Sequence, residues 1–179
     1  MGCTRSTELF TRLDGCFSPL DPPRFLCDEM LQGLGQWLRV AGYDTRLPVP
    51  GARDREVLRD ARKENRWLLT CDRGLVLHAG AGNHVVLLET EGLEENAREI
   101  TWRFDLDWLH APFSRCKRCN ARLLTREDWM SPVPIFHCPS CRQDFWQGSH
   151  VVHMRQRLHE MNVYRRSNNR NLPPGLSYS

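Results

Sequence analysis

The chain has 179 residues, 40% of them hydrophobic, and a formal net charge of +3. This length accommodates one domain, or one domain with a small added module. No apolar run approaches the roughly 20 residues that a membrane span needs. The N-terminus also lacks the apolar segment of a secretory signal. The composition therefore argues against both a membrane-spanning and a secreted protein.

Charge is distributed unevenly along the chain. Residues 1–113 carry 14 basic and 18 acidic side chains, a net of −4, whereas residues 114–179 carry 11 basic and 4 acidic side chains, a net of +7. A basic C-terminal part favours an anionic partner, with nucleic acid first among the candidates. The alternative is that these charges serve only solubility.

Residues 1–22 show no hydrophobic period and are predicted to be a flexible leader. The opening "MGCTRS" fits the myristoylation pattern, with Gly2 as the candidate site and Cys3 as a candidate palmitoylation site. Two acyl chains together would anchor a protein to a membrane. The motif is short, and a chance match is the alternative.

The chain between Arg24 and Leu106 alternates between short apolar segments and segments with a helical period. The predicted strands are residues 24–27, 43–47, 66–70 and 84–89. The predicted helices or turns are residues 29–42, 54–65, 73–82 and 92–106. Strands that alternate with helices predict a parallel sheet with right-handed crossovers, so the expected fold class is α/β.

Three aspartates fall where such a sheet binds ligands, beyond the carboxyl ends of its strands. Asp28 follows the first strand, Asp54 opens the helix after the second, and Asp72 follows the third. Each alone reads most simply as a helix cap or turn residue, which contributes about 1 kcal/mol.

Three carboxylates at one edge would repel one another unless a cation neutralises them. Oxygen ligands suit Mg²⁺ or Mn²⁺, ions that activate water for attack at phosphorus. We therefore predict a catalytic Mg²⁺ or Mn²⁺ site at Asp28, Asp54 and Asp72, and a metal-dependent nuclease.

Four cysteines form two C-x-x-C pairs, Cys116 with Cys119 and Cys138 with Cys141, with 18 residues between the pairs. This spacing is typical of a zinc site. Four thiolates around zinc leave no open coordination position, so the ion should be structural. The pattern also indicates a reducing, intracellular compartment, cytoplasmic or nuclear. Redox thiol pairs are the alternative.

The cysteine-rich segment also carries basic and aromatic side chains, a combination that suits single-stranded RNA. The predicted nucleic-acid contacts are Arg115, Lys117, Arg118, Arg122 and Arg142. Trp129, Phe136, Phe145 and Trp146 could stack on bases or form the small core of this segment, and for Phe136 and Phe145 the core is the favoured interpretation.

Several quoted stretches together carry a resemblance to a known family. They are "FLCDEMLQGLGQWLRVAGYDT", "DREVLRDARKENRWLLTCDRGL", the two cysteine pairs and "FWQGSH". Residues 24–154 resemble the PIN-like RNase domain at the C-terminus of mut-7-type exonucleases, the exonuclease mut-7 homolog family. The resemblance implies a PIN-like nuclease sheet followed by a zinc ribbon, with Asp28, Asp54 and Asp72 at its acidic positions.

Two departures from the family leave alternatives open. Many PIN-like proteins have a further acid two residues after the third aspartate, where this chain has Gly74. The exonuclease domain that precedes this region in longer relatives has no counterpart, which suggests a short isoform or a stand-alone relative. The alternatives to a nuclease are a degenerate RNA-binding or adaptor module, and a ribbon that binds protein.

The expected organisation has four parts. Residues 1–22 are the leader, residues 23–111 the PIN-like nuclease domain, and residues 112–154 the zinc ribbon. Residues 155–179 are a basic tail, predicted to be largely disordered, although a helix could extend as far as Glu160.

Overall fold

The computed structural model of the chain describes residues 22–79, 84–90, 92–126, 135–146 and 148–167. The predicted leader with its candidate lipid anchor at Gly2 and Cys3 lies outside these residues, as does Trp129. Within them, the search for a helix long and apolar enough to cross a membrane found none.

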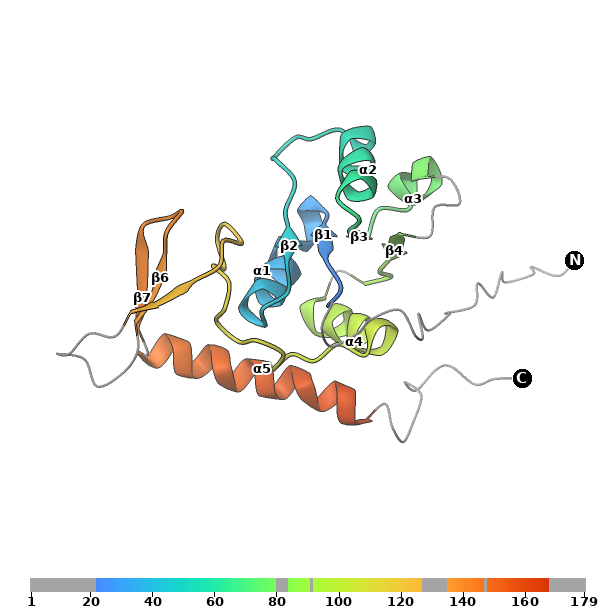
Figure 1. Cartoon of the computed structure of the whole chain (residues 1–179). Helices are drawn as coiled ribbons and strands as arrows, with labels where there is room; N and C mark the ends of the chain where they lie inside the picture. Colours follow the sequence, from blue (N-terminus) through green and yellow to red (C-terminus); the bar gives the residue numbers. More distant parts are fainter. Residues whose placement is uncertain (1–21, 80–83, 91, 127–134, 147, 168–179) are drawn as a thin grey trace, which may run out of the picture.

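A four-stranded parallel sheet forms the centre of the N-terminal part (Figure 1). Its strands are β1 (Phe25–Cys27), β2 (Thr45–Arg46), β3 (Trp67–Thr70) and β4 (Val85–Leu87). They lie in the order β2-β1-β3-β4, and every neighbouring pair is parallel. The predicted α/β fold class is therefore confirmed.

Helices alternate with these strands along the chain, as the sequence pattern predicted. They are the 3₁₀ helix η1 (Glu29–Leu31), α1 (Gln32–Val40), α2 (Asp54–Lys63), α3 (Arg73–Ala79) and α4 (Leu93–Phe104). Helix α1 ends just before Gly42, whose φ of +102° favours glycine. A Cβ atom at Gly42 would also lie 2.4 Å from the carbonyl oxygen of Ala111, so the close approach of these segments requires glycine.

Apolar clusters pack on opposite sides of the sheet because neighbouring residues of a strand point to opposite faces. In β1, Phe25 and Cys27 belong to the larger cluster, which includes side chains of α1 and α4. Leu26 belongs to the smaller cluster with Val57 and Leu58 of α2. We call the part from β1 to α4 the sheet module.

The C-terminal part contains a second, antiparallel sheet. Its strands are β5 (Leu124–Arg126), β6 (Ile135–Cys138) and β7 (Gln143–Trp146), in that order. We call residues 115–126 and 135–146 together the ribbon. The last element is the long helix α5 (Ser149–Ser167), which begins beside the ribbon and packs against α4 (Figure 1).

Helix α5 corrects the prediction of a disordered tail from residue 155. The helix continues through Ser167, and only residues 168–179 of the predicted tail lie outside the described part. Val151, Leu158 and Met161 are buried in the same apolar cluster as α4. The tail is therefore a packed helix up to Ser167, because one of its faces supplies core side chains that the basic composition masks.

We expect Leu158→Ala to lower the free energy of unfolding by about 2–5 kcal/mol, because Leu158 is fully buried and its truncation leaves a cavity. Urea denaturation followed by circular dichroism measures this change. Val152→Ala is the matched control, since Val152 is on the same helix but 59% exposed, and should change stability by less than about 0.5 kcal/mol. Equal effects of the two substitutions would show that α5 is not part of the core.

Candidate functional site

The carboxyl end of the parallel sheet brings together two of the three predicted aspartates. Asp28 caps η1, where its Oδ1 accepts a hydrogen bond from the backbone N–H of Glu29. Its Oδ2 accepts a hydrogen bond of 2.8 Å from Oγ1 of Thr70, at the end of β3. The same Thr70 oxygen accepts a hydrogen bond of 3.0 Å from the backbone N–H of Asp72. A single buried hydroxyl therefore links Asp28 to Asp72.

Thr70 is a site residue that the sequence reasoning missed. The signal was available, since Thr70 is the polar residue that ends a buried strand two positions before Asp72. Its burial is complete, so its hydroxyl cannot exchange partners with bulk water. This fixes the rotamer of Thr70 and with it the position of one Asp28 oxygen.

Asp54 borders the same end of the sheet from α2. Its Oδ2 lies 4.0 Å from Nδ1 of His78 on α3, the helix that begins directly after Asp72. Figure 1 shows η1, α2 and α3 together at this end. Asp54 is the first residue of α2 rather than its cap, a position that Arg53 takes.

The three aspartates do not form a tight cluster. Among the residues that the structure describes, only the four ribbon cysteines form a group of metal-ligating side chains whose ligand atoms all lie within 4.8 Å of one another. Asp28 and Asp72 instead accept hydrogen bonds from nearby N–H and O–H groups. The three-carboxylate metal site remains a prediction.

Gly74 lies close to Asp72, as its place in the sequence suggested. Its backbone N–H donates a hydrogen bond of 2.7 Å to Oδ1 of Asp72. A Cβ atom at residue 74 would lie 3.1 Å from that same oxygen. The missing acid of the PIN-like pattern would therefore have stood beside Asp72, where its charge would repel the existing carboxylate.

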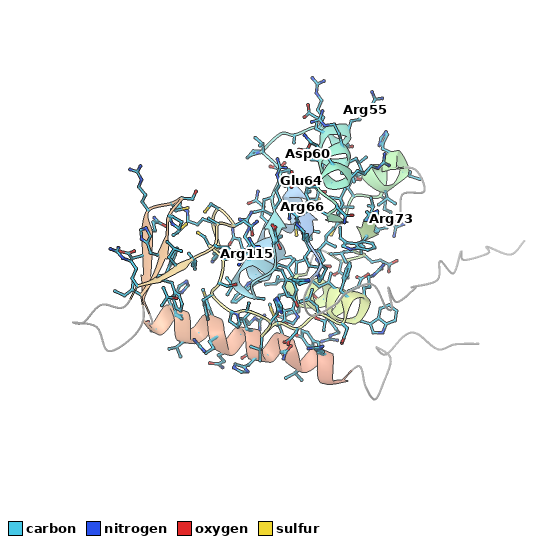
Figure 2. The ribbon with its side chains drawn as sticks, in the orientation of Figure 1. Arg55, Asp60, Glu64, Arg66, Arg73 and Arg115 are labelled. Carbon is cyan, nitrogen blue, oxygen red and sulfur yellow. The ribbon has the colours of Figure 1, made fainter. Side chains whose placement is uncertain are left out.

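Exposed basic side chains border this acidic end. Arg55 follows Asp54 on α2, and Arg73 follows Asp72 on α3. Figure 2 labels both arginines at this end of the molecule. Both are exposed, so the acidic edge carries cations that could bind a phosphate chain. The sequence analysis did not single them out.

The four ribbon cysteines converge on one point. Sγ of Cys116 lies 3.9 Å from Sγ of Cys141, and Sγ of Cys119 lies 3.5 Å from Sγ of Cys138. Zinc–sulfur bonds of 2.3 Å in a tetrahedron place the sulfur atoms about 3.8 Å apart. The described cysteines form no disulfide bonds with one another. The donor set fits a metal such as zinc.

Backbone donors surround these sulfur atoms. The N–H of Cys141 donates to Sγ of Cys138 over 3.3 Å. Burial alone would raise the pKa of Cys119, but hydrogen bonds from the backbone of Ala121 and from the neighbouring cysteines outweigh it and lower this pKa to about 6. This favours the thiolate of Cys119, the form that binds metals, whereas the hydrogen bond with Cys119 raises the pKa of Cys141 to about 12.

Two side chains connect the segment around Cys116 and Cys119 to the edge strand β2 by hydrogen bonds. Arg39, on α1, is only 4% exposed and donates to the carbonyl oxygens of Lys117, Arg118 and Thr45. Asn120 accepts a hydrogen bond of 3.1 Å from the backbone N–H of Thr45. The outer edge of β2 is therefore closed by side chains, which protects its backbone groups from unwanted strand pairing.

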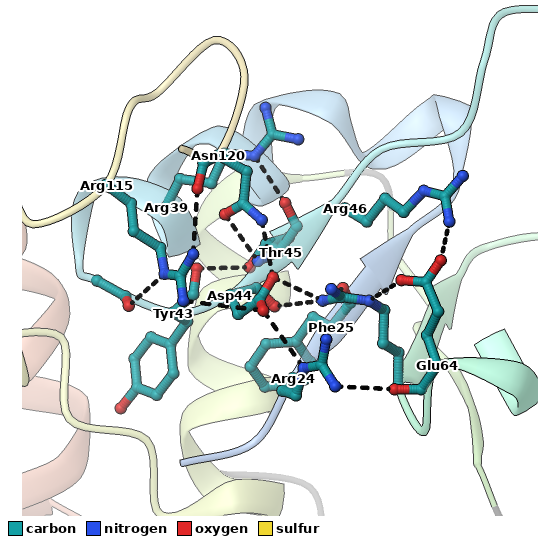
Figure 3. A network of polar contacts seen from close by, with 12 residues as sticks. Arg24, Phe25, Arg39, Tyr43, Asp44, Thr45, Arg46, Glu64, Arg115 and Asn120 are labelled. Carbon is teal, nitrogen blue, oxygen red and sulfur yellow. Dashed lines mark hydrogen bonds and ion pairs between the residues drawn. The ribbon is translucent and has the colours of Figure 1, made fainter. Parts of the chain in front are cut away.

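Asp44, just before β2, is the centre of a wider polar network (Figure 3). Its Oδ1 accepts 2.8 Å and 2.7 Å hydrogen bonds from Arg66 and Asn120, respectively. Its Oδ2 lies 3.3 Å from Nε of Arg24 and 3.8 Å from Nη2 of Arg115. One carboxylate therefore connects the sheet module to the ribbon.

This network changes the acidity of Asp44. Burial alone would raise the pKa of Asp44, but the hydrogen bonds from Arg66 and Asn120 and the positive charges of Arg66 and Arg115 together lower it to about 2. Arg66 also donates 2.7 Å to Glu64, so its buried guanidinium is shared between two carboxylates.

The predicted nucleic-acid residues differ in their surroundings. Arg115 is mostly buried and donates to the carbonyl oxygens of Gly42 and Asn120, so it has an internal role where the ribbon meets the sheet module (Figure 2). Arg118, Arg122 and Arg142 are exposed. Lys117 is half-buried, and its carbonyl oxygen accepts from Arg39. Direct RNA contact by these residues remains a prediction.

Comparison with known proteins matches residues 23–158, most of the chain, to the family described as the Mut7-C RNAse domain. The chain is also 35% identical over 101 residues to the exonuclease mut-7 homolog of Homo sapiens. The aligned region covers 54% of this chain but 12% of the human protein, so the chain corresponds to a small part of that relative. No solved structure matches the chain.

If a metal ion binds the four ribbon cysteines, its removal by a chelator should increase amide hydrogen exchange in β2 as well as in the ribbon. We expect hydrogen exchange at the Thr45 amide to accelerate at least about tenfold after metal removal, because Asn120 then no longer holds that N–H. Hydrogen-exchange mass spectrometry with and without a zinc chelator measures this. The β4 peptide is the control, and unchanged exchange at Thr45 would contradict the coupling.

The lowered pKa of Asp44 predicts a pH-dependent contribution to stability. A carboxylate with a lowered folded-state pKa stabilises fully above its unfolded-state pKa near 4, and this stabilisation is lost as the pH falls toward 2. We expect the difference in unfolding free energy between the wild type and Asp44→Asn to narrow by about 1 kcal/mol between pH 6 and pH 3. Urea titrations at each pH test this, and a constant difference would contradict it.

Proposed function

Because the chain belongs to the Mut7-C RNase domain family, we propose that it is a metal-dependent ribonuclease that hydrolyses phosphodiester bonds in single-stranded RNA. The observation that carries the proposal is the pair of aspartates that Thr70 links at the carboxyl end of the sheet. In parallel α/β sheets this end is where ligands bind. The position of these acids at that end of the sheet therefore supports the proposal.

In this proposal, Asp28, Asp54 and Asp72 hold Mg²⁺ or Mn²⁺, which when bound supplies an activated water and neutralises charge on the phosphate. The donor set is suitable, since these are hard oxygen ligands. Each Asp28 oxygen accepts one hydrogen bond and has a second lone pair available for an ion. Thr70 acts as a positioning residue that orients Asp28.

The arginines around the acidic end would hold the substrate. Arg55 and Arg73 each directly follow one of the aspartates and are exposed, so they can bind phosphates on either side of the scissile bond. Arg118, Arg122 and Arg142 extend this positive surface onto the ribbon. In our proposal, zinc in the four-cysteine site is structural. The described cysteines are not in disulfides, which suits a reducing intracellular compartment.

One observation favours a second candidate, a catalytically inactive RNA-binding or adaptor module. Gly74 leaves Asp72 without the additional acid of related proteins, and the three aspartates do not share a tight cluster. A weaker metal site would retain RNA binding without cleavage. The following experiment separates the two candidates.

We expect the purified chain to cleave single-stranded RNA in the presence of Mn²⁺. Asp28→Asn and Asp72→Asn should each reduce the rate on the order of 100-fold, because each removes a charged ligand of the proposed metal ion that stabilises the charge on the phosphate. Denaturing gel electrophoresis of an end-labelled RNA measures cleavage. Single-stranded DNA is included to define the substrate class.

Asp105→Asn is the matched control, because Asp105 is an exposed aspartate at the end of α4 and pairs with Arg165. This variant should cleave like the wild type. Equal cleavage rates of the wild type, Asp28→Asn and Asp72→Asn would refute the catalytic role of the aspartates. RNA binding without any cleavage would support the inactive module instead.

A further inference from the structure

A cavity of about 390 Å³ lies where the sheet module meets the ribbon. It lies at the amino end of the parallel sheet, because Arg24 and Asp44 in its wall precede β1 and β2. Arg24 and Asp28 flank β1, so the two ends of the sheet are about 13 Å apart at roughly 3.3 Å per residue. The cavity is therefore separate from the aspartate edge, the carboxyl end of the sheet where Asp28 and Asp72 lie.

Positive charge dominates the wall of this cavity. Arg24, Arg115 and Arg122 line it, and Asp44 is the one carboxylate among the lining residues that the structure describes. Asp44 is already shared, since Arg66 lies 2.8 Å from its Oδ1. The positive charge of the three lining arginines therefore exceeds the negative charge of the described lining residues.

Two of these arginines face each other directly. Arg115 and Arg122 are partners in an antiparallel bridge, which puts their side chains on the same face of the paired segments. Like charges in this position repel each other and destabilise the pairing. Arg115 has hydrogen-bond partners in the protein, whereas Arg122 is exposed and makes no hydrogen bond or ion pair with the described residues. An anion between them would remove the repulsion.

The other walls suit a nucleotide rather than a bare anion. The volume falls within the range of about 300–1,000 Å³ that is typical of small-molecule sites. His110 lines the cavity, and its ring stacks on Tyr43 with centroids 5.2 Å apart. An oriented aromatic ring offers a surface for a base, and Ser114 adds a hydroxyl group to the wall.

We propose that this cavity binds a nucleoside phosphate, with the phosphate between Arg24, Arg115 and Arg122. The choice of a nucleotide rests on the proposed function, whereas the choice of an anion rests on the cavity alone. The ligand is either a free nucleotide or the terminal nucleotide of an RNA strand. In the second case the cavity would hold RNA at a distance from the aspartate edge.

Isothermal titration calorimetry on the full zinc-loaded chain, without added Mg²⁺ or Mn²⁺, tests this site. The probes are uridine monophosphate, uridine, inorganic phosphate and a short RNA with a terminal phosphate. We expect saturable binding of uridine monophosphate, and at least about tenfold weaker binding of uridine, which corresponds to about 1.4 kcal/mol. Tighter binding of the RNA than of the nucleotide would identify the strand end as the ligand.

Arg122→Gln is the test variant, because Arg122 has no described partner whose loss would disturb folding. It should weaken nucleotide binding at least about tenfold. Arg126→Gln is the matched control, since Arg126 is an exposed ribbon arginine outside the cavity wall, and it should change binding less than about twofold. Absence of wild-type binding, or equal effects of the two substitutions, would overturn the proposal.

This test is independent of catalysis. Asp28→Asn and Asp72→Asn should bind uridine monophosphate as the wild type does, because both lie at the opposite end of the sheet. Nucleotide binding without RNA cleavage would contradict the proposed function and leave the cavity site intact. Cleavage without nucleotide binding would contradict the cavity site alone.

Discussion

The structure depends on the hydrogen bonds that satisfy the outer backbone groups of the short edge strand β2. Strand β2 has two residues and pairs only with β1, so its outer backbone groups need partners from elsewhere. Arg39 and Asn120 supply them at Thr45, and Asn120 also binds Asp44. Because Asn120 directly follows Cys119 of the four-cysteine cluster, the same contacts that complete the sheet attach the ribbon. The cysteine cluster and the α/β sheet are therefore joined by shared hydrogen bonds.

This arrangement gives the two ends of the sheet opposite character. The carboxyl end exposes aspartates, which Thr70 holds in register across β1 and β3. The amino end gathers arginines around Asp44, at the contact with the ribbon. A polyanion such as RNA is attracted to the basic end, whereas the acidic end requires a cation before it can approach phosphate. The proposed catalysis and the proposed anchoring of the ligand thus use different ends of one sheet.

The burial of charged side chains decides which arginines can bind a ligand. Arg39 and Arg66 are buried and donate hydrogen bonds to carbonyl and carboxylate oxygens of the protein. Arg115 is divided between internal hydrogen bonds and the cavity wall. These groups stabilise the fold, because removing one partner of a buried ion pair leaves an uncompensated charge. Exposed arginines such as Arg55 and Arg122 are free of that constraint.

The sequence by itself determined the local features. Hydrophobic periods located the helices and strands of the α/β sheet, and cysteine spacing identified the four cysteines that cluster in the ribbon, because both patterns depend on short-range geometry. Only the tertiary structure revealed that Thr70 links Asp28 to Asp72, that Arg115 faces inward and that α5 supplies core residues through Met161. These facts depend on contacts between segments far apart in the chain. Composition masked them, since a basic helix with one apolar face and a disordered basic tail contain similar residues.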